Sequence, residues 1–374
     1  MKFKTLTIRA GLATCILVAT PSFAAQGANS KIISFSAPGA DTTAGSFNGT
    51  WPHSINNLGV TAGTYYDVNG MPHGFLRSPS GQFTAIDVAG ADGGTDVAGI
   101  NDLGAVTGSY YDVDGVAHGF LRSPGGTITA FDAPGGGGFG AIPKSLNLEG
   151  VIVGYYADAN SVIRGFVRYP SGEFTTFAGP GACNSDNSTG CYGSGASNIN
   201  VFGTFAAGYN DVNFVHHGLV RTVLGKLTRF DVPGAGTDTS QGTGCPGCSL
   251  GLNQSGTIAG IYIDMNYVFH GFLRSPEGQF RKFDVPGAGT DSYQGTGCFS
   301  DCPTSLNDWG TITGSYVDAN YVQHGFLRGP AGKLATIDPS GSIATQPEGL
   351  NDFGVVTGTY VDANNVLRGF VRIP

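Results

Sequence analysis

One unit occurs seven times along the chain, and this repetition constrains the fold more than any other feature. Its signature is Ile or Leu followed by Asn-x-x-Gly, and successive copies lie 45, 46, 53, 53, 54 and 44 residues apart. A period of this length is typical of architectures in which one supersecondary unit packs against its neighbours. We number the repeats one to seven by their signature asparagines: Asn56, Asn101, Asn147, Asn200, Asn253, Asn307 and Asn351.

Each repeat contains the pattern of four strands. In repeat two, residues 105–112, 118–122 and 127–132 read as strands, with turns at 112–115 and 123–126 between them. The short stretch before the signature Asn supplies the remaining strand. Four strands in about 45 residues are typical of a β-propeller blade, whereas solenoid repeats are usually shorter and carry fewer strands.

Composition agrees with an all-β fold. Glycine contributes 62 of the 374 residues and charged residues only 12%, against averages of about 7% and about 25%. The 40% hydrophobic and 11% aromatic residues are enough to bury a core, which excludes a disordered chain. Glycine does not recur at every third position, which excludes collagen. An outer-membrane barrel would repeat as hairpins and not as four-strand units.

The two ends of the chain are complementary. Repeat seven stops before its fourth strand, and residues 33–40 resemble fourth-strand segments such as 230–235. We therefore predict that residues 31–40 pair with the strand at 369–372 and complete the last blade, which removes an exposed sheet edge. The predicted fold is all-β: a seven-bladed β-propeller with four antiparallel strands per blade, formed by residues 31–374 as a single domain.

The repeat motifs resemble a known family. The Asn-x-x-Gly turn, the Gly-x-Tyr-x-Asp strand, His-Gly-Phe-Leu and Phe-Asp-x-Pro-Gly-Ala are similar to the motifs of bacterial HAF-repeat proteins, described as extracellular repeat proteins. The second residue of the naming triplet is Gly here, and Arg164 and Arg368 replace His in two copies. The resemblance covers essentially the whole mature chain. It implies a propeller-like, exported protein and transfers no catalytic residue.

Residues 1–24 have the pattern of a secretory signal peptide. Basic residues precede an apolar stretch at 10–19, which is shorter than the roughly 20 residues of a membrane span, and residues 22–24 fit a cleavage site. We expect 25–30 to be a short linker, and the mature protein to be a secreted or periplasmic monomer without a membrane span. Its 16 basic and 27 acidic residues give a net charge of −11, which excludes nucleic acid as a partner because phosphate contacts need clustered basic residues.

Aspartate turns between the second and third strands recur in every repeat. They lie on the face where each connection reaches its inner strand, here called the loop face; the opposite face, with the Asn-x-x-Gly turns, is the turn face. Asp and Asn bond turn amides, and this spacing lacks the remaining ligands of a calcium loop, so we expect turns and no cofactor. The turns begin at Asp67, Asp112, Asp158, Asp211, Asp264, Asp318 and Asp362.

Arginine and histidine recur at further fixed positions. An Arg ends every third strand, and we expect it to bond turn carbonyls. A His opens the third strand in five repeats; one per repeat is too widely spaced to share a metal ion, so packed or turn-bonded His is the better interpretation. The residues are Arg77, Arg122, Arg168, Arg221, Arg274, Arg328 and Arg372, with His73, His118, His217, His270 and His324.

Six cysteines lie in three long connections between repeats. In an oxidising compartment the simplest pairing is local, although 15 pairings exist and the two CxxC-like pairs also have zinc-ligand spacing. We expect disulfides and no metal. The predicted pairs are Cys183–Cys191, Cys245–Cys248 and Cys298–Cys302.

Differences between repeats mark candidate binding residues. Three residues before each signature Asn, the inner strand carries a different side chain in each repeat, and such strands line a propeller's channel. Because repeats seven and one adjoin, Glu348, His53 and Lys144 share one sector of the channel mouth in this fold, with Trp51 nearby; a merely wet, unconstrained position is the alternative. The series runs His53, Ala98, Lys144, Ser197, Leu250, Thr304 and Glu348.

The long connections before repeats five and six supply a second candidate surface. They are near-copies of each other, and Gln241, Tyr293 and Gln294 offer hydrogen bonds and stacking to a polar ligand; tolerated insertions are the alternative. No catalytic motif is present. We predict an exported module that binds a saccharide or a protein through the loop face. The alternatives are a polysaccharide hydrolase or lyase using Glu348 and His53 as acid and base, and a structural envelope or matrix component.

Overall fold

The computed structural model describes residues 30–46, 48–184, 193–244, 249–298 and 303–374. Their regular secondary structure is entirely β-strand, with no helix among them. The all-β prediction is thus confirmed for the described residues. The predicted signal peptide at 1–24 and all but the last residue of the linker at 25–30 lie outside them.

Strands follow the repeats in chain order. Repeat one is β2 (Thr50–Ile55), β3 (Thr61–Tyr66), β4 (Pro72–Arg77) and β5 (Phe83–Ile86). Repeat two is β6 (Thr95–Ile100), β7 (Val106–Tyr111), β8 (Ala117–Arg122) and β9 (Ile128–Phe131). Repeat three is β10 (Gly136–Leu146), β11 (Ile152–Asp158), β12 (Ile163–Arg168) and β13 (Phe174–Phe177). Repeat four is β14 (Ser194–Ile199), β15 (Phe205–Asn210), β16 (His216–Arg221) and β17 (Leu227–Phe230).

The remaining repeats follow the same order. Repeat five is β18 (Gly242–Thr243), β19 (Gly251–Leu252), β20 (Ile258–Ile263), β21 (Phe269–Arg274) and β22 (Phe280–Phe283). Repeat six is β23 (Ser305–Leu306), β24 (Ile312–Val317), β25 (Gln323–Arg328) and β26 (Leu334–Thr336). Repeat seven is β27 (Ser342–Leu350), β28 (Val356–Asp362) and β29 (Leu367–Ile373), to which β1 (Lys31–Phe35) is added.

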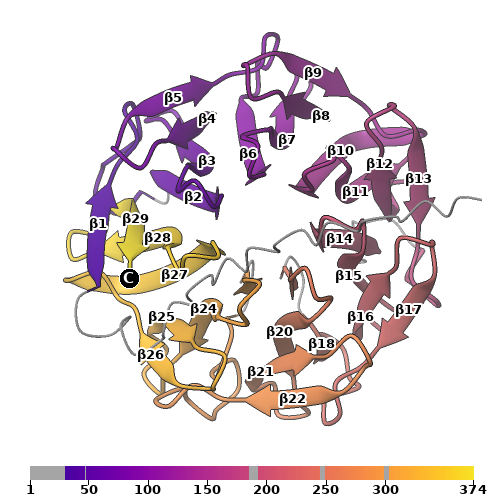
Figure 1. Cartoon of the computed structure of the whole chain (residues 1–374), viewed down its shortest axis with the longest axis vertical. Helices are drawn as coiled ribbons and strands as arrows, with labels where there is room; N and C mark the ends of the chain where they lie inside the picture. Colours follow the sequence, from indigo (N-terminus) through magenta and orange to yellow (C-terminus); the bar gives the residue numbers. More distant parts are fainter. Residues whose placement is uncertain (1–29, 47, 185–192, 245–248, 299–302) are drawn as a thin grey trace, which may run out of the picture.

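The strands within each repeat pair antiparallel in sequence order, as β2-β3-β4-β5 does in repeat one. Repeats four and five join into one nine-stranded sheet through a single parallel pair between His216 and Gly242. Figure 1 shows the sheets set radially around a central axis, with strands such as β2, β6 and β10 innermost and β5, β9 and β13 at the rim.

The hydrophobic core lies between neighbouring repeats. One cluster joins Ile86 of repeat one to Val97, Val106 and Phe120 of repeat two, all nearly inaccessible to solvent. The Gly before the third-strand Phe is required by this packing: a Cβ at Gly119 would lie 2.2 Å from the ring of Phe131. Second strands such as β20 and β24 are therefore buried along their whole length, whereas outer strands such as β5 and β9 keep exposed residues.

The N-terminal strand pairs with the C-terminal one, as predicted. Residues Lys31 to Phe35 of β1 pair antiparallel with Ile373 to Gly369 of β29. The pairing is shorter than the predicted 31–40, because the chain turns at Pro38-Gly39, where Ala40 N donates to Ala37 O. This strand is the fourth of repeat seven and lies at the rim (Figure 1).

Candidate functional site

Hydrogen bonds between the signature asparagines hold the inner strands together. Each side chain donates from Nδ2 to the backbone carbonyl of the next signature Asn, over 2.9 to 3.4 Å. The last bond runs from Asn351 to Asn56, so the series returns to its start. This network fixes the inner strands around the axis and thereby positions every side chain just upstream of it.

The residue three positions before the signature Asn is a β-bulge in five repeats. The register of the inner strand shifts across His53, Ala98, Lys144, Ser197 and Glu348. The extra residue of a bulge is left unpaired and its side chain is re-aimed. In repeats one, three and seven a Pro, which lacks an N–H, precedes the bulge. The bulge therefore explains why this position tolerates so many side chains.

Four of the five bulge residues line one cavity at the loop-face end of the axis. The cavity has a volume of about 500 Å³. Its walls include the start of the inner strands in repeats one, two, three and seven, and the ends of β3 and β7. Its lining residues are Asn48, Trp51, His53, Tyr66, Asp96, Val97, Ala98, Ser109, Ile142, Pro143, Lys144, Ser249, Pro303, Gln346 and Glu348. We call it the loop-face cavity.

A histidine between two carboxylates forms the polar centre of the cavity. His53 Nδ1 lies 2.7 Å from Glu348 Oε2, and His53 Nε2 lies 4.0 Å from Asp96 Oδ1. Burial lowers the pKa of His53, but the charge and hydrogen bond of Glu348, with a contribution from Asp96, more than offset it, so the pKa is raised above 6.5. The pair thus favours an imidazolium, and Lys144 opposes that charge only weakly.

Glu348 has an unused acceptor. The residue is only 8% exposed, and its Oε1 is buried without a hydrogen-bond partner among the described residues. The indole Nε1 of Trp51 is unpaired in the same sense. Buried polar atoms in native proteins nearly always have partners, so these two side chains bring unused hydrogen-bonding capacity to the cavity wall.

Other charges and rings complete the walls. Asp96 Oδ1 accepts a 2.5 Å hydrogen bond from Thr64 Oγ1, which fixes its position. Burial and the charge of Asp96 raise the pKa of Tyr66 to about 12, so its hydroxyl stays protonated and can donate. The Lys144 ammonium lies 5.7 Å from the ring centre of Tyr155. The cavity therefore presents donors, acceptors and aromatic surface together.

The sequence-predicted channel residues come together in this cavity. Trp51, His53, Lys144 and Glu348 all line it, and His53 bonds Glu348 directly. Sequence reasoning missed Asp96 and the other wall residues. Asp96 occupies in repeat two the position that Trp51 holds in repeat one, five residues before the signature Asn. Strand alternation places that position on the same side as the bulge, so scanning it would have found Asp96.

The predicted glutamine ligands belong to loop structure. Gln241 and Gln294 are each 1% exposed. Oε1 of Gln241 accepts from Asp238 N and its Nε2 donates to Met265 O, and Gln294 makes the equivalent bonds with Asp291 and Ala319. Both amides are therefore hydrogen-bonded within the protein, and their contact with a ligand stays a prediction. Tyr293 is 43% exposed and its ring lies 5.7 Å from that of Tyr267.

Two cavity-lining residues follow cysteine-bearing segments in the sequence. Ser249 and Pro303, which line the loop-face cavity, directly follow the connections with the predicted pairs Cys245–Cys248 and Cys298–Cys302. Cys183 and Cys298 each take part in a disulfide bond, and neither partner is among the described residues. The other four mature cysteines lie outside the described residues, so the three loop-local pairings stay predictions, which non-reducing peptide mapping tests.

In repeats two, four, five and six, the turn aspartate and the histidine are joined by direct contacts, as expected from turn chemistry. In repeat two, Asp112 Oδ1 accepts from the N–H groups of Asp114 and Val116, both at 2.9 Å, while Oδ2 lies 3.3 Å from His118 Nε2. His118 Nδ1 bonds Asp132, and its ring stacks on Tyr110. These carboxylates are already engaged by turn N–H groups and histidine, which argues against the calcium interpretation.

The repeated arginines bond a turn carbonyl, as predicted, in repeats one, two, five and six, and some of them also contact a neighbouring repeat. Arg77 donates a single long bond of 3.4 Å to the turn carbonyl of Ser78, so it does not bind several carbonyls. Its guanidinium instead lies 4.6 Å from the ring centre of Phe35, in the neighbouring repeat. Arg168, Arg274 and Arg328 lie over Phe rings of the preceding repeat in the same way. These four arginines therefore cap the packing between repeats, whereas Arg221 lies over Phe205 of its own repeat.

Comparison with known proteins identifies the fold. No family model and no curated protein matches the chain. A virginiamycin B lyase from Staphylococcus aureus superposes with a TM-score of 0.58 at 15% identity, over 91% of this chain and 99% of that one. The fold is a β-propeller.

Two hydrolases contain a similar unit. A puromycin hydrolase matches with a TM-score of 0.52 at 11% identity, and a prolyl endopeptidase with 0.50 at 12%, each over 87% of this chain. This propeller spans 53% and 46% of those chains, respectively.

Among its described residues, no helix is long and apolar enough to cross a membrane.

Proposed function

We propose that the protein is an exported, seven-bladed propeller of the HAF-repeat kind that binds a hydroxyl-rich ligand, a saccharide or the end of a saccharide chain, in the loop-face cavity. The returning series of asparagine bonds and the pairing of β1 with β29 support a closed ring. A closed ring leaves the cavity as a preformed concave site at its mouth. Its volume of about 500 Å³ lies within the 300–1,000 Å³ typical of small-molecule sites.

The unpaired Oε1 of Glu348 carries the proposal. A buried carboxylate oxygen without a donor costs free energy, of the order of 1–3 kcal/mol or more, and a ligand hydroxyl would supply that donor. His53 already occupies Oε2, so the carboxylate is held in one orientation toward the ligand. A sugar offers several hydroxyls with both donor and acceptor capacity, which suits a site with acceptors on Glu348 and Asp96 and donors on Tyr66 and Lys144.

The aromatic wall suits the same ligand class. Trp51 lines the cavity with part of its ring exposed. A sugar ring has an apolar face that packs on aromatic surface, while its hydroxyls bond the polar groups around it.

One observation favours an enzyme as the second candidate. The bond from Glu348 to His53 Nδ1 orients the imidazole and leaves Nε2 for proton exchange with a ligand in the cavity. A His oriented in this way by a carboxylate is the usual arrangement of a general base or acid. The reaction would be hydrolysis or elimination on a polysaccharide, and His53 would be its proton-transfer group.

A panel of plant, fungal and bacterial glycans, scored for both binding and turnover, tests the proposal. We expect a glycan ligand for the wild type and at least tenfold weaker binding for Glu348→Gln, because a charge-assisted hydrogen bond contributes about 1.5–3 kcal/mol. Glu149→Gln, at an exposed site on the turn face, is the matched control. His53→Gln keeps a donor for Glu348 but removes the base, so loss of turnover with retained binding would establish the enzyme. Absence of both binding and turnover would contradict the proposal and leave a structural component.

A further inference from the structure

The turn face carries a ring of exposed apolar side chains. In six of the seven repeats, one of the two residues between the signature Asn and the Gly is a large apolar residue that is 36% to 68% exposed. An isolated exposed Leu or Phe is common on protein surfaces, but larger apolar groupings mark interaction sites. The ring consists of Leu58, Leu103, Leu148, Phe202, Trp309 and Phe353.

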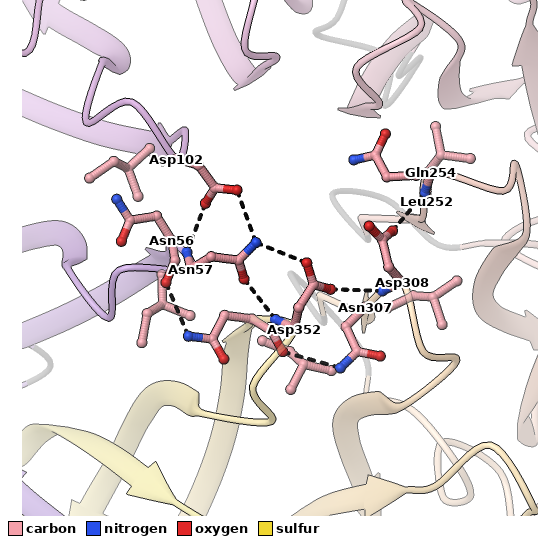
Figure 2. A pocket seen from close by; sticks show the side chains of 13 residues that line it. Asn56, Asn57, Asp102, Leu252, Gln254, Asn307, Asp308 and Asp352 are labelled. Carbon is pink, nitrogen blue, oxygen red and sulfur yellow. Dashed lines mark hydrogen bonds between the residues drawn. The ribbon is translucent and has the colours of Figure 1, made fainter. Parts of the chain in front are cut away.

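Hydrogen bonds connect these turns to one another around the axis. The backbone N–H of Asn57 donates to Asp102, that of Asp352 to Asn57, and that of Asp308 to Asp352, over 2.7 to 2.9 Å. Figure 2 shows these side chains converging on one hollow from separate turns. The apolar residues therefore project from neighbouring turns of one rigid network and form a common border.

The hollow inside the ring is acidic. It has a volume of about 130 Å³, and Asp102, Asp308 and Asp352 contribute carboxylates to its wall (Figure 2). The described residues that line it include no Lys or Arg. Burial raises the pKa of Asp308, and the charges of Asp352 and Asp102 raise it further. The three carboxylates thus repel one another, and a cation placed among them would relieve that repulsion.

We propose that the turn face is a docking surface for a protein segment that presents one Lys or Arg side chain surrounded by apolar side chains. The cation would enter the hollow and face the three carboxylates, while its apolar neighbours would cover the ring of Leu, Phe and Trp. This combination gives an apolar contact with a charge complement at its centre, the arrangement that fixes specificity at protein interfaces. The proposal is independent of any ligand in the loop-face cavity, at the other end of the axis.

Charge argues against the other occupants of this surface. A second copy stacked turn face to turn face would bring Asp102, Asp308 and Asp352 against their own counterparts, and like charges opposed across an interface cost several kcal/mol. An anionic lipid surface would meet the same three carboxylates. A small molecule in the hollow would leave the apolar ring uncovered, since that ring spans six repeats.

Fluorescence gives a separate readout for this face. The chain has two tryptophans, Trp51 in the cavity and Trp309 in the ring. In a Trp51→Phe variant, Trp309 is the sole tryptophan and reports only on the turn face. The probe is a synthetic peptide with one Lys or Arg flanked by Leu and Phe and with Gly-Ser ends, compared with the same peptide carrying Glu in place of the basic residue.

We expect the basic peptides to shift the Trp309 emission and to bind at least tenfold more tightly than the Glu peptide, with affinity that falls as salt rises. Binding should weaken at least tenfold in Asp102→Asn/Asp308→Asn/Asp352→Asn, which keeps an acceptor oxygen at each site, and in Leu58→Ser/Phe202→Ser/Phe353→Ser. The matched control Val68→Ser/Val113→Ser/Val212→Ser changes exposed apolar residues of the loop face and should bind as the parent does.

Equal binding of basic and Glu peptides would overturn the proposal, as would no peptide binding at all. Concentration-dependent self-association in sedimentation velocity, abolished by the Ser variant, would assign the face to a second copy instead. Binding to phosphatidylcholine–phosphatidylglycerol vesicles without peptide binding would assign it to lipid. Thermal unfolding of each variant establishes that it is folded; if the Asn variant is not, the Glu peptide and the salt dependence still decide the outcome.

Discussion

At the scale of single residues, the loop-face cavity depends on the balance between burial and charge at His53. Burial disfavours the imidazolium, and Glu348, 2.7 Å away, favours it; the net result is a raised pKa. His216 shows the opposite balance, since burial and the charge of His217 lower its pKa to about 4. The pKa values of His53 and His216 are therefore shifted in opposite directions within one molecule.

The first prediction concerns the titration of His53. We expect NMR to give a His53 pKa above 6.5 in the wild type and below 6.5 in Glu348→Gln, because burial then acts with less opposition. A histidine with a raised folded pKa stabilises the fold fully below its unfolded pKa, and that contribution is lost as pH rises through the folded pKa. The wild type should lose this stabilisation as pH rises from 6.5 through the raised folded pKa of His53, and the variant should not. A wild-type value at or below 6.5 would show that Glu348 is not the controlling partner.

At the scale of elements, the asparagine turn is the unit that joins strands within a repeat and repeats to one another. Asn101 Oδ1 accepts from the N–H groups of Leu103 and Ala105, and Nδ2 donates to Asn147 O. One buried side chain therefore satisfies three backbone groups in two repeats. This accounts for the presence of Asn in all seven signatures better than turn propensity does, because Asp would lack the Nδ2 donor.

The second prediction is that Asn101→Ala lowers the free energy of unfolding by about 3 kcal/mol, since it leaves several partly or fully buried backbone groups unpaired. Asn69→Ala, in an exposed Asp-x-Asn turn, should change it by less than about 0.5 kcal/mol. Urea unfolding of both variants checks this. Similar small effects for the two would mean that the ring of asparagine bonds contributes nothing to stability.

The N-terminal strand joins the two ends of the chain through side chains as well as backbone. Phe35 packs against the rings of Phe75 and Phe83 of repeat one, and Arg77 lies over it. The same strand pairs with β29 of repeat seven. It therefore contributes to two repeats at once, and its loss exposes both an apolar surface and a sheet edge.

The third prediction follows from this position. Phe35→Ala should lower the free energy of unfolding by about 2 kcal/mol, because the ring is half-buried, while Lys31→Ala, at an exposed site of the same strand, should be neutral. Deletion of residues 31–35 should also produce concentration-dependent oligomers in size-exclusion chromatography. A monomeric deletion variant with unchanged thermal stability would contradict the closure by β1.

At the scale of the whole molecule, the periodic sequence predicts the architecture well because each repeat solves the same packing problem. The four-strand spacing and the Gly before the third-strand Phe can be recognised because they recur from repeat to repeat. The truncation of repeat seven can be recognised because its fourth strand is absent where the other repeats have one. The site is less predictable. The site is defined by one position in the inner strands and not by a repeated residue pattern. At that position a β-bulge turns His53 and Glu348 toward the axis, but the bulge residue differs from repeat to repeat, so its identity does not reveal it.

Two sets of side-chain contacts could not be predicted from the sequence, for the same physical reason. Gln241 and Gln294 have the composition of ligand-binding loops, but their amides are consumed by backbone groups that only the folded connection brings near. Arg77 has the donors to bond several turn carbonyls, but it bonds only that of Ser78 among the described residues, and its guanidinium stacks on Phe35 of another repeat. Both depend on contacts between repeats, which the sequence of one repeat does not contain.

The most direct measurement of the central claim is the fluorescence of Trp51 in a Trp309→Phe variant, titrated with saccharides from the glycan panel. Trp51 is then the sole tryptophan and lines the loop-face cavity. The account predicts a saturable change in its emission with a bound saccharide, and at least tenfold weaker binding when Glu348→Gln is added. A saccharide that binds the protein without changing Trp51 emission, and with affinity unaffected by Glu348→Gln, would place the ligand outside the cavity and contradict the account.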